Sequence, residues 1–171
     1  MIFVSGIHGV GKSYFCELVK KRININTYTA SSLIAAKKKT KFPSDKLIPD
    51  INDNQQYLLQ AVNELRLSDK NFILDGHFCL LNAQGQIQRI SFSTFNNLKP
   101  EAILLLTEDP EIIAKRRHSR DNQNISVQSI QAFQNFEEIY AKEIARNINA
   151  NLFISKGYND LEKALEFIKS C

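Results

Sequence analysis

The chain opens with Met1-Ile2-Phe3-Val4-Ser5-Gly6-Ile7-His8-Gly9-Val10-Gly11-Lys12-Ser13, and this stretch decides the fold. The apolar run Ile2–Val4 predicts a buried strand, and Gly6–Ser13 has the pattern G-x-x-x-x-G-K-S. A helical pattern follows from Lys12 to Arg22. This order of strand, glycine-rich loop and helix is the context in which the pattern binds the phosphates of a nucleoside triphosphate.

The residue types in this loop have direct physical roles. Glycine has no Cβ, so its N–H group can approach an anion closely. Consecutive N–H groups form a concave phosphate site, and the start of the following helix adds partial positive charge. Lys12 is expected to reach the β- and γ-phosphates, and the Ser13 hydroxyl to bind Mg²⁺. Three of the chain's six glycines lie in this loop, a concentration that ordinary turns do not explain.

The composition is that of an ordinary globular protein. A chain of 171 residues with 43% hydrophobic and 23% charged residues fits one domain with a full core. The three cysteines are scattered without C-x-x-C spacing, which predicts reduced thiols and neither a disulfide nor a zinc site. No apolar run approaches the roughly 20 residues of a membrane span, and the first strand leaves no room for a signal peptide. We therefore expect a cytoplasmic protein. The net charge of +4 suits an anionic ligand but is too weak to indicate nucleic acid.

Short apolar segments alternate with longer amphipathic ones along the chain, which predicts a parallel sheet covered by helices. The expected strands are Ile2–Val4, Asn26–Thr29, Phe72–Leu74, Ala102–Leu106 and Leu152–Ile154. The expected helices are Lys12–Arg22, a short one after Thr29, Asn54–Leu67, one from Pro110 to about Ser119, a long one after Ser126, and a last one from Asn159 or Asp160. The long helix carries Val127, Ile130, Phe133, Phe136, Tyr140 and Ile144 along one stripe, and Asn82–Gly85 predicts a hairpin.

The second half of the predicted site begins at Asp75. An apolar strand ending in Asp places the carboxylate at the carboxyl edge of the sheet, where ligands of such folds bind. Asp75 is therefore a candidate for orienting Mg²⁺, although a strand-ending Asp next to Gly76 also fits a simple turn cap.

Two basic clusters follow. Arg116 and Arg120 are four residues apart, so both fit one helix face and both suit contact with a transferring phosphoryl group. A solvated basic helix end is the simpler reading of the same residues. The run Lys37–Lys41 has the composition of a solvated surface, or of a site for an acceptor phosphate or RNA. We interpret His8 as a loop residue lining the phosphate site, and His77 and His118 as local packing or capping residues.

Missing features narrow the function. The chain has no N-K-x-D segment for guanine, and no acid follows the second strand in Tyr28–Ser32 to deprotonate a hydroxyl acceptor. A phosphate acceptor needs no such base because its second pKa is near 6. The sequence thus favours a phosphate-bearing acceptor over a hydroxyl-bearing one.

These features together resemble the adenylate kinase group of P-loop nucleoside monophosphate kinases, in its compact archaeal-type form with a short lid. The resemblance runs from Gly6–Ser13 through Ile73–His77 to Asp109–Ile113 and Arg116-Arg117. It implies a P-loop NTPase fold, a three-layer α/β/α sandwich with a five-stranded parallel sheet of order 2-3-1-4-5. It also implies one kinase domain over residues 1–171, with acceptor-binding helices at about 30–69, beginning in Tyr28–Ala36, and a short lid at about 116–127.

The resemblance implies a cytoplasmic, Mg²⁺- and ATP-dependent kinase of a nucleoside monophosphate or a similar small phosphate. Lys12, Asp75, Arg116 and Arg120 would be catalytic, with Ser13 and Asp75 on the metal, Arg116 on the adenine and Arg120 near the transferring phosphate. The expected nucleotide contacts are Gly6, His8, Gly9, Val10, Gly11, Lys12, Ser13, Tyr14, Arg116 and Arg117. The two arginines that hold the acceptor phosphate in typical members correspond here to Ala35 and Cys79, with Lys37 or its neighbours as substitutes.

Two other functions stay open. The missing acceptor arginines and the lysine run fit an ATP-dependent switch or assembly factor that acts on an RNA or protein partner. A kinase of a hydroxyl acceptor is the other alternative, with Asp45, Asp50 or Asp53 as its base.

Overall fold

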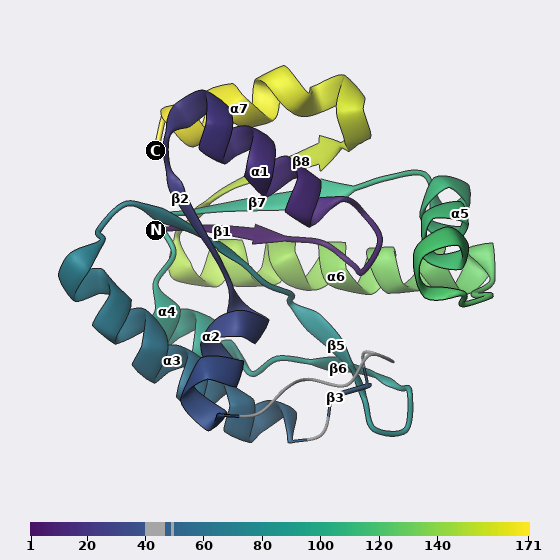
Figure 1. Cartoon of the computed structure of the whole chain (residues 1–171), viewed down its shortest axis with the longest axis horizontal. Coiled ribbons are helices and arrows are strands. Elements are labelled where there is room, and N and C mark those ends of the chain that lie inside the picture. The colour runs from purple at the N-terminus through teal and green to yellow at the C-terminus, as the bar shows by residue number, and fades with distance from the viewer. Residues whose placement is uncertain (40–46, 49) are drawn as a thin grey trace.

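A computed structural model describes residues 1–39, 47–48 and 50–171. Its centre is a five-stranded parallel sheet with the order β2-β4-β1-β7-β8 (Figure 1). The strands are β1 (Ile2–Ser5), β2 (Asn26–Thr29), β4 (Phe72–Asp75), β7 (Ala102–Thr107) and β8 (Asn151–Lys156). Counted among themselves in chain order, they are arranged 2-3-1-4-5. The predicted α/β class with a five-stranded parallel sheet is confirmed.

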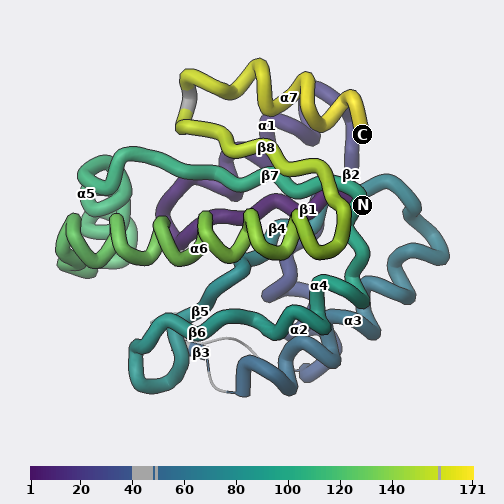
Figure 2. The backbone as a smooth tube through the Cα atoms, turned by 180° about the vertical axis from the view of Figure 1, so that it is seen from behind, coloured from purple at the N-terminus to yellow at the C-terminus, as the bar shows by residue number. Residues whose placement is uncertain are grey.

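Helices cover both faces of this sheet. The front and back views show α1 (Lys12–Ile23) and α7 (Leu161–Lys169) on one face and α6 (Val127–Ile148) on the other (Figures 1 and 2). Helix α5 (Pro110–Asp121) follows β7 at the carboxyl edge of the sheet, and a 3₁₀ turn at Gly157–Asp160 joins β8 to α7. The strands β1, β4 and most of β7 are buried on both faces, as their continuous apolar sequences predict.

A smaller group of elements lies below the sheet in Figure 1. Helices α2 (Ala30–Lys38) and α3 (Ile51–Ser68) pack against each other, and α4 (Phe92–Leu98) packs on α3. The strands β5 (Cys79–Asn82) and β6 (Ile87–Arg89) form the predicted antiparallel hairpin. The short strand β3 (Leu47–Ile48) pairs with β5 in a second sheet, which the sequence did not predict.

The helix starts follow the predicted capping chemistry. The Asp109 side chain accepts a hydrogen bond from Glu111 N at 2.8 Å, with Pro110 at the first helical position. The Ser126 hydroxyl accepts from Ser129 N at 3.1 Å. These two bonds fix the start of α5 and the start of α6.

Two predicted details are wrong. Helix α3 begins at Ile51 rather than Asn54, because Asp50 in a left-handed conformation precedes it and Ile51 packs into the core. On α6, Val127 and Phe136 are exposed. The face of α6 that packs on the sheet contains Glu137 next to Tyr140, so a carboxylate takes the place that the sequence reading gave to Phe136.

In the described part of the chain, every helix is too short or too polar to cross a lipid bilayer.

Candidate functional site

The P-loop connects β1 to α1, and its glycines have backbone conformations that other residues rarely adopt. Gly6, Gly9 and Gly11 have φ angles of 144°, 90° and 110°. A Cβ on Gly6 would lie 2.5 Å from the Leu106 carbonyl oxygen, and a Cβ on Gly9 would lie 2.8 Å from Arg117 Cγ. The sequence pattern is therefore required by both backbone geometry and packing.

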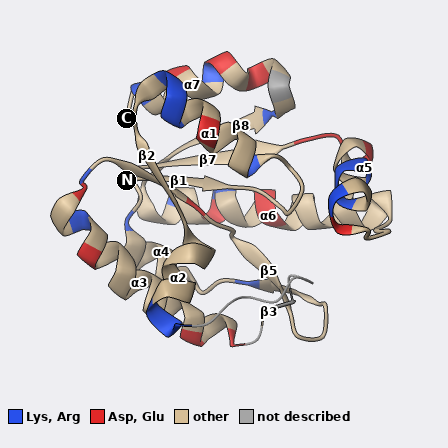
Figure 3. Ribbon diagram, in the orientation of Figure 1, with Lys and Arg blue, Asp and Glu red and all other residues tan. Residues whose placement is uncertain are grey.

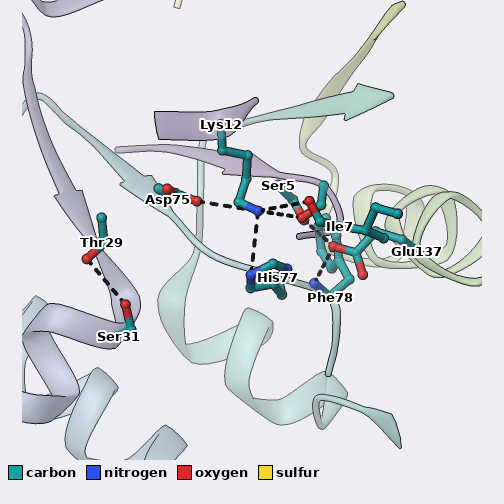
Figure 4. Close-up of polar contacts among 10 residues, drawn as sticks. Ser5, Ile7, Lys12, Thr29, Ser31, Asp75, His77, Phe78 and Glu137 are labelled. Atoms are coloured by element: carbon teal, nitrogen blue, oxygen red, sulfur yellow. Dashed lines mark hydrogen bonds and ion pairs between the residues drawn. The ribbon is translucent and has the colours of Figure 1, made fainter. Parts of the chain in front are cut away.

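Lys12 lies at the centre of the site, at the start of α1 (Figure 4). Its ammonium donates a hydrogen bond to Gly6 O at 2.6 Å and lies 3.9 Å from Asp75 Oδ1. The side chain is 8% exposed, and burial lowers the pKa of its ammonium while the carboxylates of Asp75 and Glu137 oppose that shift. Lys12 is therefore a nearly buried cation held at the mouth of the P-loop.

Asp75 ends β4 directly opposite Val4 of β1. Its carboxyl group is largely buried, and this burial raises its pKa, while Lys12 acts in the opposite direction. Ser13 is exposed at the first turn of α1, and both residues line the same cavity. The described residues contain no cluster of three or more His, Cys, Asp or Glu side chains that would hold a metal alone. One carboxylate and one hydroxyl suit Mg²⁺, which takes its other ligands from phosphates and water.

His77, which the sequence predicts to be a local packing or capping residue, packs against His8 beside the P-loop. His77 Nε2 lies 3.5 Å from Lys12 Nζ, and its ring lies 4.3 Å from the ring of His8 between centroids. Both rings line the cavity beside the P-loop. His8 lies where the sequence placed it, and the segment after β4 brings His77 to the same point.

Glu137 is a central residue that the sequence reading missed. Its carboxylate is buried and accepts hydrogen bonds from Phe78 N at 2.9 Å, Cys79 N at 2.7 Å and the Ser5 hydroxyl (Figure 4). Burial raises its pKa, and these three hydrogen bonds oppose that shift. Glu137 thus joins α6 to Ser5, which directly precedes the P-loop, and to the segment after β4 that carries His77.

Helix α5 brings the predicted arginines to the P-loop. Arg116 donates to Val10 O at 3.0 Å and to Glu108 Oε2 at 3.2 Å. Arg120 lines the same cavity and forms two 2.7 Å hydrogen bonds to Asp121. Arg117 instead points away from solvent, is 5% exposed, and packs against Gly9. Arg117 is therefore a packing support of the loop rather than an exposed ligand contact.

A cavity of about 1110 Å³ joins these residues to α2, α3 and α4. Its P-loop end is lined by residues 7–14 with Thr107, Glu108, Lys115, Arg116, Ser119, Arg120 and Asp121, and Asp75 and His77 lie between the two ends. Its α3 end is lined by Thr29, Ala30, Ser31, Ile34, Ile48, Asn54, Gln55, Leu58, Leu80, Ile90, Thr94, Phe95 and Leu98. Among the described lining residues, Lys and Arg occur only at the P-loop end. Figure 3 shows the same contrast between charged α5 and the mostly tan elements β5, α3 and α4.

The lysine run does not line this cavity where it is described. Lys37 forms an ion pair with Glu64 at 2.6 Å, and Lys38 forms one with Asp53 at 3.0 Å. Asp53 and Asp50 do not line the cavity either, so the structure does not place them as a base. Lys41 and Asp45 lie outside the described residues. Ala35 and Cys79, the positions that replace the acceptor arginines, are in α2 and β5.

Comparisons with known proteins agree with this geometry. A family model described as AAA domain matches residues 5–134, which is more than half of the chain. The adenylate kinase of Methanothermobacter thermautotrophicus is 28% identical over 181 residues, covering 99% of this chain and 97% of that protein.

Solved structures share the fold at low sequence identity. A shikimate kinase from Acinetobacter baumannii in complex with shikimate has a TM-score of 0.61 at 16% identity, covering 99% of this chain and 92% of that one. A gluconokinase from Sinorhizobium meliloti has a TM-score of 0.55 at 15% identity, covering 99% and 89%. The match over residues 5–134 shows that the chain belongs to the AAA domain family, and the solved structures show that it shares the fold of these two kinases.

Proposed function

We propose that the chain is an ATP-dependent phosphotransferase that moves the γ-phosphoryl group of Mg²⁺-ATP to a small acceptor. The observation that carries this proposal is the cavity that continues from the P-loop to α2, α3 and α4. Its volume of about 1110 Å³ is above the usual range of roughly 300–1,000 Å³ for a single ligand. An enzyme that only hydrolyses ATP has no need of a second, mostly apolar end.

The P-loop end suits the donor. The N–H groups of the glycine-rich loop and the start of α1 would bind the phosphates. Ser13 and Asp75 would hold Mg²⁺, which neutralises charge on the phosphate oxygens when bound. Arg116, already at the P-loop through Val10 O, would contact the nucleotide. Gly6, His8, Gly9, Val10, Gly11 and Tyr14 complete the proposed nucleotide contacts.

Lys12 and Arg120 would act on the group in transfer. Negative charge spreads over the equatorial oxygens of the phosphoryl group in the transition state, and fixed cations lower its energy. Lys12 is already confined by Gly6 O and Asp75, so its ammonium needs little reorganisation. Arg120 is 58% exposed near the end of α5, within the proposed lid at 116–127. Closing this lid would exclude water from the phosphoryl group.

The test is acceptor-dependent turnover. Purified protein is incubated with Mg²⁺-ATP and matched acceptors, namely nucleosides, their 5′-monophosphates, shikimate and gluconate. ADP is measured by a coupled assay, and the phosphorylated acceptor is identified by mass spectrometry. Lys12→Ala gives the background. We expect at least one acceptor to increase ADP formation above hydrolysis in its absence and to gain one phosphoryl group.

The alternative functions give different outcomes in the same experiment. ATP hydrolysis that no acceptor increases, but that RNA stimulates, would contradict the kinase proposal and support a nucleotide-dependent switch. Transfer to a monophosphate would support the acceptor class that the sequence favours. Transfer to a nucleoside or sugar acid hydroxyl would support the hydroxyl-acceptor alternative.

A further inference from the structure

The α3 end of the cavity differs chemically from a phosphate site. None of its described lining side chains carries a charge, and most are aliphatic or aromatic. Leu58, Phe95 and Leu98 there are nearly inaccessible to solvent. Transferring an anion into such surroundings without a partner is costly. The described residues therefore favour an uncharged group at this end.

Gln55 is one of the polar residues in this mostly apolar lining. It lies on α3, lines the cavity, and is 5% exposed. Its Nε2 donates to Ile51 O at 3.1 Å, and a carbonyl oxygen only accepts, so the side-chain amide is oriented with Oε1 on the other side. Oε1 is buried, and no donor of the described residues lies within hydrogen-bond distance of it.

A buried acceptor without a donor costs about 1–3 kcal/mol. Buried polar groups in native proteins are nearly always paired, so an exception calls for an explanation. Gln55 is not required by helix formation, because an apolar residue would continue the buried face formed by Ile51, Leu58 and Val62. A ligand that brings a donor to Oε1 provides that explanation.

We propose that Gln55 recognises the acceptor substrate by a hydrogen bond to its Oε1. This substrate is an uncharged molecule with an apolar body and a hydroxyl or amino group that donates to Gln55 Oε1. This inference rests on the proposed function, and it defines the acceptor class for the same cavity. Discrimination would follow from the pairing, because a molecule without the donor leaves Oε1 buried and unsatisfied.

The test uses Gln55→Met, which keeps the length of the side chain and removes its polar atoms. The matched control is Gln56→Met, the same substitution at the next and exposed position of α3. Ligands are nucleosides and their 5′-monophosphates, which differ only by the phosphate. Binding is measured by calorimetry and thermal shift in the presence of Mg²⁺ and a non-hydrolysable ATP analogue, and KM values for acceptor and ATP are measured by turnover.

For each nucleoside that binds, we expect the uncharged nucleoside to bind more tightly than its 5′-monophosphate. Gln55→Met should weaken that binding, and raise the acceptor KM, by about 10- to 100-fold, with the KM for ATP and the Gln56→Met control unchanged. Thermal stability without ligand should stay equal or rise, because an unpaired buried oxygen is removed.

Other results overturn the inference. The inference is wrong if no uncharged compound binds or if the monophosphates bind more tightly. It is also wrong if Gln55→Met lowers stability without changing acceptor binding. The calorimetry separates this inference from the proposed function. If acceptors bind in a Gln55-dependent way but no phosphoryl group is transferred, only the proposed kinase activity is contradicted. If transfer occurs and Gln55→Met leaves it unchanged, only the inference about Gln55 is contradicted.

Discussion

The sequence specifies the two ends of the cavity in different ways. The P-loop end is built from backbone conformation and fixed charge, and a local sequence pattern specifies it. The α3 end is built from side chains of β2, α2, α3, β5 and α4, which come together only in the fold. The proposed nucleotide site can therefore be predicted largely from one short stretch of sequence, whereas the proposed acceptor site depends on contacts between distant segments.

The largest effect is expected at the charged end. Lys12→Ala removes the buried ammonium beside Asp75, and turnover of Mg²⁺-ATP should fall about 10²-fold or more, as for loss of a transition-state charge contact. The control is Lys20→Ala, an exposed lysine in the last turn of the same helix. Steady-state kinetics measure both. If Lys12→Ala leaves turnover unchanged, the proposal that the P-loop end binds phosphate is wrong.

The next effect tests whether the two ends depend on a common support. In Glu137→Gln, an amide NH₂ group replaces the carboxylate oxygen that accepts a hydrogen bond from Cys79 N. The NH₂ group and the Cys79 N–H are then two donors that face each other without an acceptor. The free energy of unfolding should fall by about 2 to 3 kcal/mol, in the range for hydrogen bonds to a charged group. Because Glu137 holds Ser5 before the P-loop and Phe78 after His77, kcat should also fall in protein that is still folded. Chemical denaturation and kinetics below the transition measure the two effects.

The matched control for that variant is Glu138→Gln, the neighbouring residue, which pairs with Lys142 at the surface. It should change stability by no more than about 0.5 kcal/mol. If Glu137→Gln lowers stability but leaves kcat and both KM values unchanged, Glu137 supports the fold without positioning the site.

A smaller effect separates backbone strain from packing in the P-loop. Gly9→Ala introduces a Cβ at a φ of 90° and 2.8 Å from Arg117 Cγ. The control Gly85→Ala has a φ of 74° but nothing within 4 Å of the new Cβ. We expect a loss of unfolding free energy of about 2 kcal/mol for Gly9→Ala and about 1 kcal/mol for Gly85→Ala. Only Gly9→Ala should also weaken Mg²⁺-ATP binding in calorimetry, and equal effects at both positions would contradict a packed P-loop.

The strands of the five-stranded sheet, the P-loop and the starts of α5 and α6 could be predicted from sequence because each rests on local chemistry. Apolar runs predict buried strands, and Asp109 with Pro110 predicts a helix start. The sequence reading was wrong where a polar residue occupies a buried face. The predicted start of α3 at Asn54 left out its first residues from Ile51, and Glu137 was passed over in favour of Phe136 on α6.

These polar residues interrupt the hydrophobic pattern because they meet partners from other segments. Glu137 meets the amides of Phe78 and Cys79, which lie 59 and 58 residues away in sequence. Hydrophobic periodicity carries no information about such partners. Local patterns fail most often at functional sites, so a glutamate or glutamine on an otherwise apolar helix face is a useful signal for finding them.

The smallest expected effect tests the lysines of α2, which the resemblance offers as substitutes for the missing acceptor arginines. Lys37→Gln and Lys38→Gln each remove one partner of an ion pair, with Glu64 and Asp53 respectively, and neither lysine lines the cavity. Exposed pairs of this kind contribute about 0–1 kcal/mol, so stability should change little and the acceptor KM less than about threefold. Titration of the acceptor at saturating ATP measures this. An increase of tenfold or more in KM for a monophosphate, with the nucleoside unaffected, would show that α2 binds an acceptor phosphate and that charge is not confined to the P-loop end.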